Sequence, residues 1–467
     1  TPNIIMKSFL FRISLLLFSI LILNACKDDE GSDYVPLNII ANADSGEVFQ
    51  NAVLEIAVLA NDTNVPQNGN ITLTAPQSGT VTINNNGTSA TILDDTVEYS
   101  PNATFVGEVT FEYTICDPSG QSCATGTVTI TVLPFSPVNF DINEVPYEKL
   151  SDYNFYEGNL ADLSPVYGVL PYEPINTLFS DYAHKKRFVW MPYNVSATYV
   201  SDGDNLDFPT GSVLIKTFYY DNVLPNNTTK NIETRLLIKK ADGWIFANYI
   251  WDEAQQEAIL NTTGNGFNVP IDWIENGETK SVNYRIPSET ECFICHKSFD
   301  MIIPIAPKPQ NLNSIYSYAE GMENQLEKWK EIGYLSNNNI PANIETVPNW
   351  KDISQTLETR VRSYFDINCA HCHVYGGHCG ARSLRLAFRE SNNPDNLGIC
   401  VEPDLQIPGY DGAKLITPGD AENSILFFRQ ATTLEEYRMP MNGRTLVDET
   451  FLPVLEEWIN SLTEPCD

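Results

Sequence analysis

Apolar and polar positions alternate along the first long segment of the chain, from about 38 to 134. Val, Ile and Thr recur at every second position there, and turn-forming pairs such as Asn61-Asp62 and Asn86-Gly87 interrupt the runs. A period of two is typical of strands with one buried face. Short strands at regular spacing predict a β-sandwich over residues 38–134.

The pattern changes after a proline-containing linker at 133–137. Runs of β-branched and aromatic residues then predict strands of an antiparallel core, and they lie at 213–220, 234–238 and 244–251. Apolar residues at helical spacing predict helices, and they lie at 324–333, 354–366 and 447–462. We therefore expect a mainly β, multidomain protein with a β-rich domain at 141–345 and an all-α domain at 346–467.

The beginning of the chain predicts export. Lys7 and Arg12 precede an apolar run at 13–23, which is too short to span a bilayer and is typical of a signal peptide. The following Leu23-Asn-Ala-Cys26 resembles the lipobox of bacterial lipoproteins, which implies removal of residues 1–25 and lipidation of Cys26. An acidic tether at 26–37 would follow.

Within that tether, Lys27-Asp-Asp-Glu30 is similar to a signal that sends lipoproteins to the cell surface. We expect an outer-membrane protein, on the periplasmic face or at the cell surface, that touches the membrane through its lipid alone. The chain carries 28 Lys and Arg against 60 Asp and Glu, a formal net charge of -32. This balance argues against nucleic-acid binding, which needs clustered cations, and favours basic protein partners.

Two Cys-x-x-Cys-His motifs carry the candidate chemistry. They are Cys292-Phe-Ile-Cys295-His296 and Cys369-Ala-His-Cys372-His373. Two thiols at this spacing can each form a thioether with one haem vinyl group, and the next imidazole is then held beneath the iron. With 10 Cys and 5 His in 467 residues, chance predicts roughly 0.002 such motifs. The sequence therefore predicts two covalently bound haem c groups, with His296 and His373 as proximal iron ligands.

Other uses of these cysteines stay open at this point: a zinc site, a dithiol redox pair, or ordinary disulfides. In zinc ribbons, about 15 to 20 residues usually separate the two pairs, whereas Cys295 and Cys369 are 74 apart. A redox pair needs no following histidine and belongs on a thioredoxin-like βαβ pattern, which this sequence lacks.

A methionine near the end of the chain is the expected sixth ligand of the second iron. Met439 lies in Arg438-Met-Pro-Met441, before the last predicted helix, and methionine ligation raises a haem potential relative to histidine ligation. Met441 is the rival ligand, and core packing is the other interpretation of Met439. For the first iron the sequence names no sixth ligand.

The remaining histidines and cysteines receive provisional roles. His184 is expected at the surface, and His371 and His378 are expected to play no ligand role. Cys116 and Cys123 flank a short turn and are expected to pair in an oxidising compartment. We also expect a disulfide between Cys379 and Cys400, which leaves Cys466 as an odd thiol.

From about residue 141 to the end, the chain resembles a family of bacterial diheme c-type cytochromes. The resemblance rests on both haem motifs, on Arg438-Met-Pro440, and on four shorter pieces. These are Leu178-Phe-Ser-Asp-Tyr182 with Lys186-Arg-Phe188, Tyr249-Ile-Trp-Asp252, Gln310-Asn-Leu-Asn313 and Asn368. It implies haem binding, electron transfer and a cytochrome c-like plan for 346–467. Residues 97–132 separately resemble the last strands of bacterial Ig-like, cadherin-like repeats, through Tyr99-Ser-Pro, Phe105-Val-Gly and Tyr113-Thr-Ile-Cys-Asp.

These observations predict an exported, lipid-anchored diheme cytochrome c that relays single electrons between redox partners. The alternative is a diheme redox enzyme whose first iron keeps an open position and acts on peroxide or an organic substrate. A surface adhesion role, resting on the Ig-like domain alone, is the third possibility.

Overall fold

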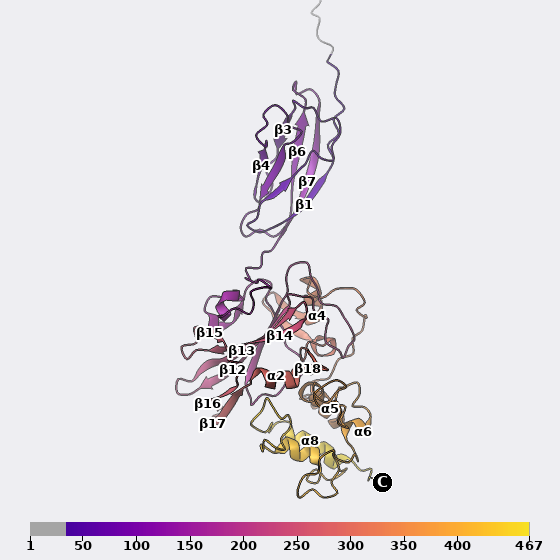
Figure 1. The fold of residues 1–467 in the computed structure, drawn as a ribbon. Helices are drawn as coiled ribbons and strands as arrows, with labels where there is room; N and C mark the ends of the chain where they lie inside the picture. The colour runs from indigo at the N-terminus through magenta and orange to yellow at the C-terminus, as the bar shows by residue number, and fades with distance from the viewer. Residues whose placement is uncertain (1–33, 467) are drawn as a thin grey trace, which may run out of the picture. The chain divides into compact units, whose positions relative to one another are not determined.

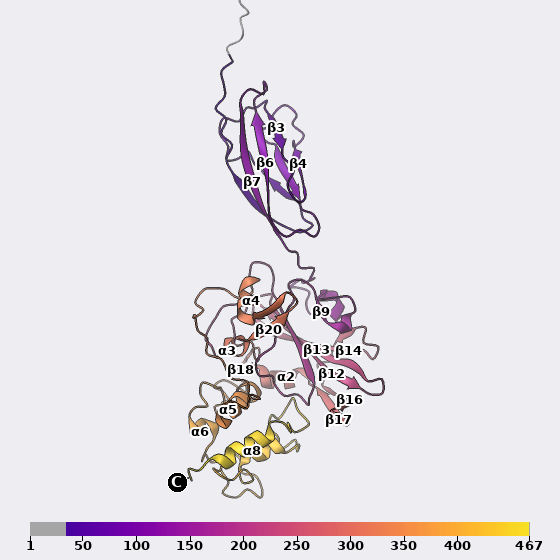
Figure 2. The same ribbon diagram turned by 180° about the vertical axis from the view of Figure 1, so that it is seen from behind.

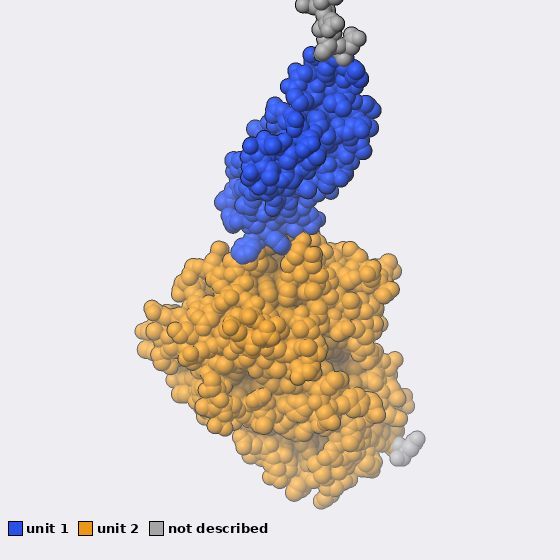
Figure 3. Space-filling view, turned by 45° about the horizontal axis from the view of Figure 1, so that its top comes forward, with its two compact units in different colours: residues 1–135 blue, residues 136–467 orange. Residues whose placement is uncertain are grey.

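The computed structural model describes residues 34–466, which form two compact units divided after Phe135 (Figures 1 and 3). The predicted signal peptide at 1–25, the lipobox Cys26 and the first part of the tether lie outside the described residues. Among the residues that are described, no helix is both long and apolar enough to cross a membrane.

The first unit is a β-sandwich, as the period-two pattern predicts. One sheet has the order β1-β7-β6-β3 and the other β2-β5-β4. The strands are β1 (Asp44–Phe49), β2 (Leu54–Ile56), β3 (Asn70–Leu73), β4 (Thr80–Asn84), β5 (Thr96–Ser100), β6 (Gly107–Cys116) and β7 (Cys123–Leu133). Alternate residues of β6 and β7 are buried between the sheets. The structure links Cys116 to Cys123 at the end of this hairpin, as predicted.

The second unit contains a larger antiparallel sheet with the order β10-β11-β12-β13-β14-β15, which β16 joins through β12 and β17 joins through β16 (Figure 1). Its strands are β10 (Leu170–Pro171), β11 (His184–Trp190), β12 (Val213–Val223), β13 (Thr228–Lys240), β14 (Gly243–Trp251), β15 (Ala258–Leu260), β16 (Phe267–Glu275) and β17 (Glu278–Ile286). β12, β13 and β14 coincide with the three predicted strands. Three two-stranded pairs complete the β structure: β8 (Tyr156–Glu157) with β9 (Ser164–Pro165), β18 (Lys297–Ser298) with β19 (Met301–Ile302), and β20 (Ile315–Tyr318) with β21 (Gly321–Asn324).

Helices gather in the later part of this unit (Figure 2). They are α2 (Glu289–His296), α3 (Pro309–Leu312), α4 (Gln325–Glu331), α5 (Leu357–Asn368), α6 (Pro394–Leu397), α7 (Ile425–Ala431) and α8 (Leu452–Ser461), with 3-10 turns η1 (Leu150–Tyr153) and η2 (Leu160–Asp162) nearer the start. α4, α5 and α8 match the three predicted helices to within a few residues. α8 buries one apolar face against α5, and the rings of Tyr364 and Phe451 stack with centroids 3.4 Å apart at that contact.

The predicted division at 345/346 does not separate two compact units, because the chain from Ser136 onward forms one. Hydrogen bonds between distant segments explain this. Asp366 of α5 accepts bonds from the side chains of Gln310 and Asn311, at 3.2 and 3.4 Å. The backbone N–H of Phe179 donates to the Asn368 side chain at 2.7 Å. The sequence pieces that carry the cytochrome resemblance thus join the β-rich and helical parts.

Candidate functional site

The first Cys-x-x-Cys-His motif lies on a short helix, α2. Ser288 caps it: its hydroxyl accepts a bond from the N–H of Glu291, and the Glu291 carboxylate accepts one from the N–H of Ser288. This reciprocal capping box stabilises a helix of only eight residues. The helix ends at His296, the last residue of the motif.

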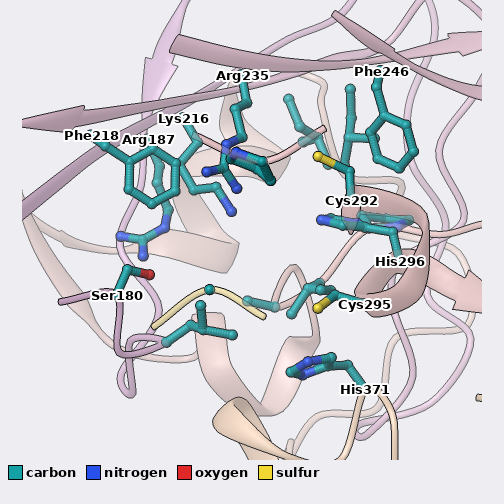
Figure 4. Close-up of a pocket in the computed structure, with 18 of the residues that line it drawn as sticks. Ser180, Arg187, Lys216, Phe218, Arg235, Phe246, Cys292, Cys295, His296 and His371 are labelled. Carbon is teal, nitrogen blue, oxygen red and sulfur yellow. The ribbon is translucent and has the colours of Figure 1, made fainter. Parts of the chain in front are cut away.

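The first motif faces a cavity of about 1380 Å³, part of which opens to solvent. The walls come from β11–β14, α2 and the segment around Pro440. Figure 4 shows Cys292, Cys295 and His296 on one side of this space and a group of cationic side chains on the other. Apolar and aromatic side chains with a few polar groups line it, which is typical of ligand and cofactor pockets.

The second motif follows directly from the end of α5. The N–H groups of Cys372 and His373 both donate to the carbonyl of Cys369, at 3.1 and 2.9 Å, so the motif forms a tight turn. It faces a smaller cavity of about 380 Å³, whose lining includes Met439 and Met441. The structure therefore brings both predicted candidates for the sixth ligand to the second motif, and it does not choose between them.

The two cavities share a wall, although the motifs are far apart in the sequence. Cys295, His371, Pro440 and Asn442 line both. The sulfurs of Cys295 and Cys372 and a ring nitrogen of His371 all lie within 4.8 Å of one another. His371 was expected to play no ligand role. The expectation assumed that His371 points away from a ligand position. In the structure His371 belongs to the second motif but its ring lies beside Cys295 of the first motif.

Burial controls the charge state of the two motif histidines. Burial lowers the pKa of His296 to about 3, with a smaller contribution from nearby Lys216. Burial likewise lowers the pKa of His373 to about 4. Both rings are therefore neutral at pH 7. A neutral imidazole has a lone pair with which to bind a metal.

A backbone carbonyl fixes the orientation of the first ring. Nδ1 of His296 lies 2.7 Å from the carbonyl oxygen of Ile303, so the N–H of the neutral ring is on Nδ1 and the lone pair is on Nε2. Metal-binding histidines usually donate their second N–H in this way. Nδ1 of His373 is buried and has no hydrogen-bond partner among the described residues.

A buried arginine holds the loop that carries both methionines. Arg444 donates to the carbonyl of Met439 at 3.0 Å and to the carbonyls of Arg429 and Leu446, each at 2.9 Å. It is 3% exposed. Sequence reasoning missed Arg444, since nothing in its local sequence distinguishes it from a surface arginine.

A second anchor for the same loop comes from the β-rich part. The carboxylate of Asp181 accepts bonds from the N–H groups of Thr445 and Leu446, both at 2.7 Å. The Tyr182 hydroxyl donates to the carbonyl of Val447 at 2.9 Å. The sequence singled out this Asp-Tyr pair as part of a family resemblance, and the structure gives it a physical role in positioning the methionine loop.

The cysteine pairing differs from the prediction at one place. Cys400 forms its disulfide with Cys466 and not with Cys379. Cys379 remains a free thiol and lines the second cavity. The four motif cysteines are also free. Cysteine counting could not decide this, because spacing alone does not fix connectivity.

Other histidine and methionine positions also lie away from the first cavity. His184 is exposed on β11 and faces Asp221, with His184 Nε2 3.9 Å from the carboxylate. Met191 is buried in a core cluster, whereas Met301 and Met322 are exposed. His378 lines neither cavity.

The residues present fit covalently attached haem at both motifs. Each motif supplies two unpaired thiols and a neutral, partly buried imidazole, and the His296 ring is held with Nε2 free. The contact of Cys295, His371 and Cys372 also fits a smaller ligand, a zinc ion, because thiolate and imidazole are the donors that zinc prefers.

Residues 35–131 match the model of the bacterial Ig domain family. The match covers the first unit and identifies it as a bacterial Ig domain. It extends to none of the residues in the two cavities, so it leaves the second unit unassigned. No curated protein matches the chain.

Comparison with solved structures gives only weak similarities. A sialyltransferase from Photobacterium sp. JT-ISH-224 is 8% identical over 20% of this chain and 18% of its own, with a TM-score of 0.15. An endo-fucoidan hydrolase of glycoside hydrolase family 107 is 11% identical, covering 52% of this chain and 27% of that chain, with a TM-score of 0.17. A SusE-like polysaccharide-binding protein from Bacteroides thetaiotaomicron is 12% identical, covering 46% and 36%, with a TM-score of 0.15. Similarities this low carry no argument about function.

Proposed function

We propose that the second unit is a diheme c-type cytochrome that passes single electrons between two covalently held haems and an external redox partner. The observation that carries this proposal is the shared wall. Two Cys-x-x-Cys-His motifs from distant segments open onto adjoining cavities, and the sulfurs of Cys295 and Cys372 lie within 4.8 Å of each other. Groups attached to these sulfurs would have neighbouring edges, which is what direct electron exchange needs.

The chain's own residues have distinct roles in this proposal. Cys292 and Cys295 tether the first group, and Cys369 and Cys372 tether the second. His296 and His373 supply the proximal nitrogens, and Met439 supplies the sixth ligand of the second iron, with Met441 as its rival. Haem iron, when bound, takes up and releases one electron at a time.

We further propose that the mature chain is a lipoprotein anchored through Cys26 at the outer membrane. An Ig domain between the tether and the cytochrome unit supports this, because such a module can act as a spacer. The formal net charge of -32 favours basic partners, and their association with this chain should weaken as salt rises.

Peptide mapping after alkylation tests the proposal directly. The full chain is produced with haem-attachment machinery, denatured without reduction and alkylated. Two thioether-linked haems leave Cys379 as the one reactive thiol among the described residues, since disulfides occupy the other four cysteines outside the motifs. Alkylation of all four motif cysteines would overturn the proposal. Zinc in place of haem on elemental analysis would assign Cys295, His371 and Cys372 to a metal site instead.

A second candidate function rests on the size of the first cavity. No methionine lines it among the described residues. A redox enzyme that acts on a small substrate beside an open first iron would use such a space. Substrate-dependent turnover that Met439→Ala leaves unchanged, and that Cys292→Ser/Cys295→Ser abolishes, would favour the enzyme.

A further inference from the structure

A row of cations crosses the sheet that forms one wall of the first cavity. Arg187 of β11 lies opposite Lys216 of β12, and Lys216 lies opposite Arg235 of β13. The next position in the row, opposite Arg235, is Asn248 of β14. Side chains of directly opposite residues share one face of a sheet, and like charges placed there destabilise it. All four residues line the cavity.

Acidic side chains neutralise only one of these cations. The Arg235 guanidinium forms a two-pronged ion pair with Glu233, a fully buried residue that also accepts a bond from the Tyr284 hydroxyl. Arg187 is 7% exposed, yet no carboxylate between residues 34 and 466 forms an ion pair with it or with Lys216. Buried Arg187 and partly buried Lys216 therefore face the cavity without an ion-pairing carboxylate among the described residues, and the Lys216 amine lies over the Phe218 ring, 5.3 Å from its centroid. Burying an uncompensated charge is costly.

Other acids that line the cavity are already engaged. Asp181 accepts bonds from the methionine loop, and Glu291 pairs with Arg285 and caps α2. Burial, followed by the charges of Arg235 and Arg187, lowers the pKa of Lys216 to about 7. A bound anion would reverse this effect by stabilising the charged amine.

The side chain at the β14 end of the row also lacks hydrogen-bond partners among the described residues. Both the amide nitrogen and the amide oxygen of the Asn248 side chain are buried, and neither has a hydrogen-bond partner among the described residues. Native proteins rarely leave such atoms unpaired without a ligand or water. Arg187 and Asn248 are three strands apart, so the amide belongs to a separate polar part of the cavity wall. The flat guanidinium of Arg187, with Lys216 on the neighbouring strand, suits a two-oxygen anion such as a carboxylate.

We propose that Arg187 and Lys216 form a carboxylate-binding site, with Arg235 fixed beside them by Glu233. Figure 4 shows Arg187 and Lys216 across the cavity from Cys295 and His296. A haem attached at Cys292 and Cys295 would carry two propionates, so a propionate is one source of carboxylate for these cations. A haem propionate as the bound carboxylate rests on the proposed function. The alternative ligand is a free small carboxylate.

The first experiment tests the row without haem. The full-length Cys292→Ser/Cys295→Ser variant is heated in acetate and in chloride of equal ionic strength. We expect acetate to raise the melting temperature, because a ligand that binds only the folded state stabilises it. Arg187→Gln and Lys216→Gln, added singly, should abolish the rise. Lys186→Gln should keep it, since Lys186 is exposed on the same strand. Wild-type chain made without haem provides a second unloaded sample.

The second experiment identifies the source in the haem-loaded chain. If haem carboxylates occupy the row, added acetate leaves the melting temperature unchanged, and Arg187→Gln lowers the midpoint potential of the first haem while Lys186→Gln does not. If the ligand is a free carboxylate, acetate still raises the melting temperature of the loaded chain. Absence of an acetate-specific rise in both unloaded samples would overturn the carboxylate site. Absence of haem in the wild-type chain would overturn the proposed function alone.

Discussion

The two Cys-x-x-Cys-His motifs have the same sequence plan but opposite surroundings. The first lies on the short helix α2, none of whose residues is buried, and faces the larger cavity with its cationic wall. The second follows the buried end of α5 and faces a smaller cavity with a methionine loop tied at several points. A motif can specify attachment, but the rest of the fold decides whether a bound group would be enclosed or accessible.

Carbon monoxide binding to the reduced, haem-loaded chain tests this comparison most strongly. We expect one of the two haems to bind it, because two methionines line the second cavity, whereas no methionine between residues 34 and 466 lines the first. Visible spectra before and after the gas measure the effect. If Met439 is the sixth ligand, the second haem should also bind carbon monoxide in Met439→Ala. If Met441 is the ligand, the same change should appear in Met441→Ala.

The contrary outcome is equally informative. No reaction in the wild-type chain would mean that the first iron is closed. His371 is then the candidate ligand, since it lines the first cavity from the second motif. Reaction of one haem in His371→Ala, but not in His378→Ala, would assign it.

Loss of the Cys400–Cys466 disulfide should have the next largest effect. This bond closes a loop with a sequence separation of 66 around the methionine loop and α8. Chain-entropy arguments put its contribution at about 4 kcal/mol, against about 2 kcal/mol for a loop as short as that of Cys116–Cys123. Denaturant unfolding of Cys400→Ser/Cys466→Ser, with Cys116→Ser/Cys123→Ser as the control, measures both. A larger loss of unfolding free energy in Cys116→Ser/Cys123→Ser than in Cys400→Ser/Cys466→Ser would contradict this prediction.

Much of this architecture could be predicted from the sequence. The period-two pattern located the sandwich, and runs of apolar residues located β12–β14 and the helices α4, α5 and α8. These signals are local, since each element's own residues set its periodicity. The motif cysteines and histidines were visible for the same reason.

What could not be predicted depends on contacts across long sequence separations. Asp181 meets Thr445 across 264 residues, and no local pattern marks that pairing. Arg187, Lys216 and Arg235 form a row only because the strand register aligns them. Counting cysteines likewise could not show that Cys466, rather than Cys379, pairs with Cys400.

Arg444→Met should loosen the methionine loop. The variant keeps an unbranched side chain but removes the charged donor of the carbonyls of Met439, Arg429 and Leu446. The Met439 and Arg429 carbonyls keep other donors, so the expected loss is that of hydrogen bonds from a charged group, about 1.5–3 kcal/mol. Denaturant unfolding measures the loss. Arg389→Met is the control, because its ion pair with Asp204 is half exposed and should contribute about 1 kcal/mol or less.

Asp181→Asn should produce the smallest change of this series. The N–H groups of Thr445 and Leu446 both donate to one carboxylate oxygen, which the neutral amide keeps as a weaker acceptor, but the amide nitrogen cannot accept the bond that the Thr445 hydroxyl donates to the other oxygen. We expect a loss of about 1–2 kcal/mol in the free energy of unfolding. In the haem-loaded chain a larger share of the second haem should also bind carbon monoxide, because Asp181 restrains the segment that follows Met439 and Met441. Equal stability and equal carbon monoxide binding in Asp181→Asn and wild type would mean that Arg444 alone holds the loop, and the role assigned to the Asp181 contact would then be wrong.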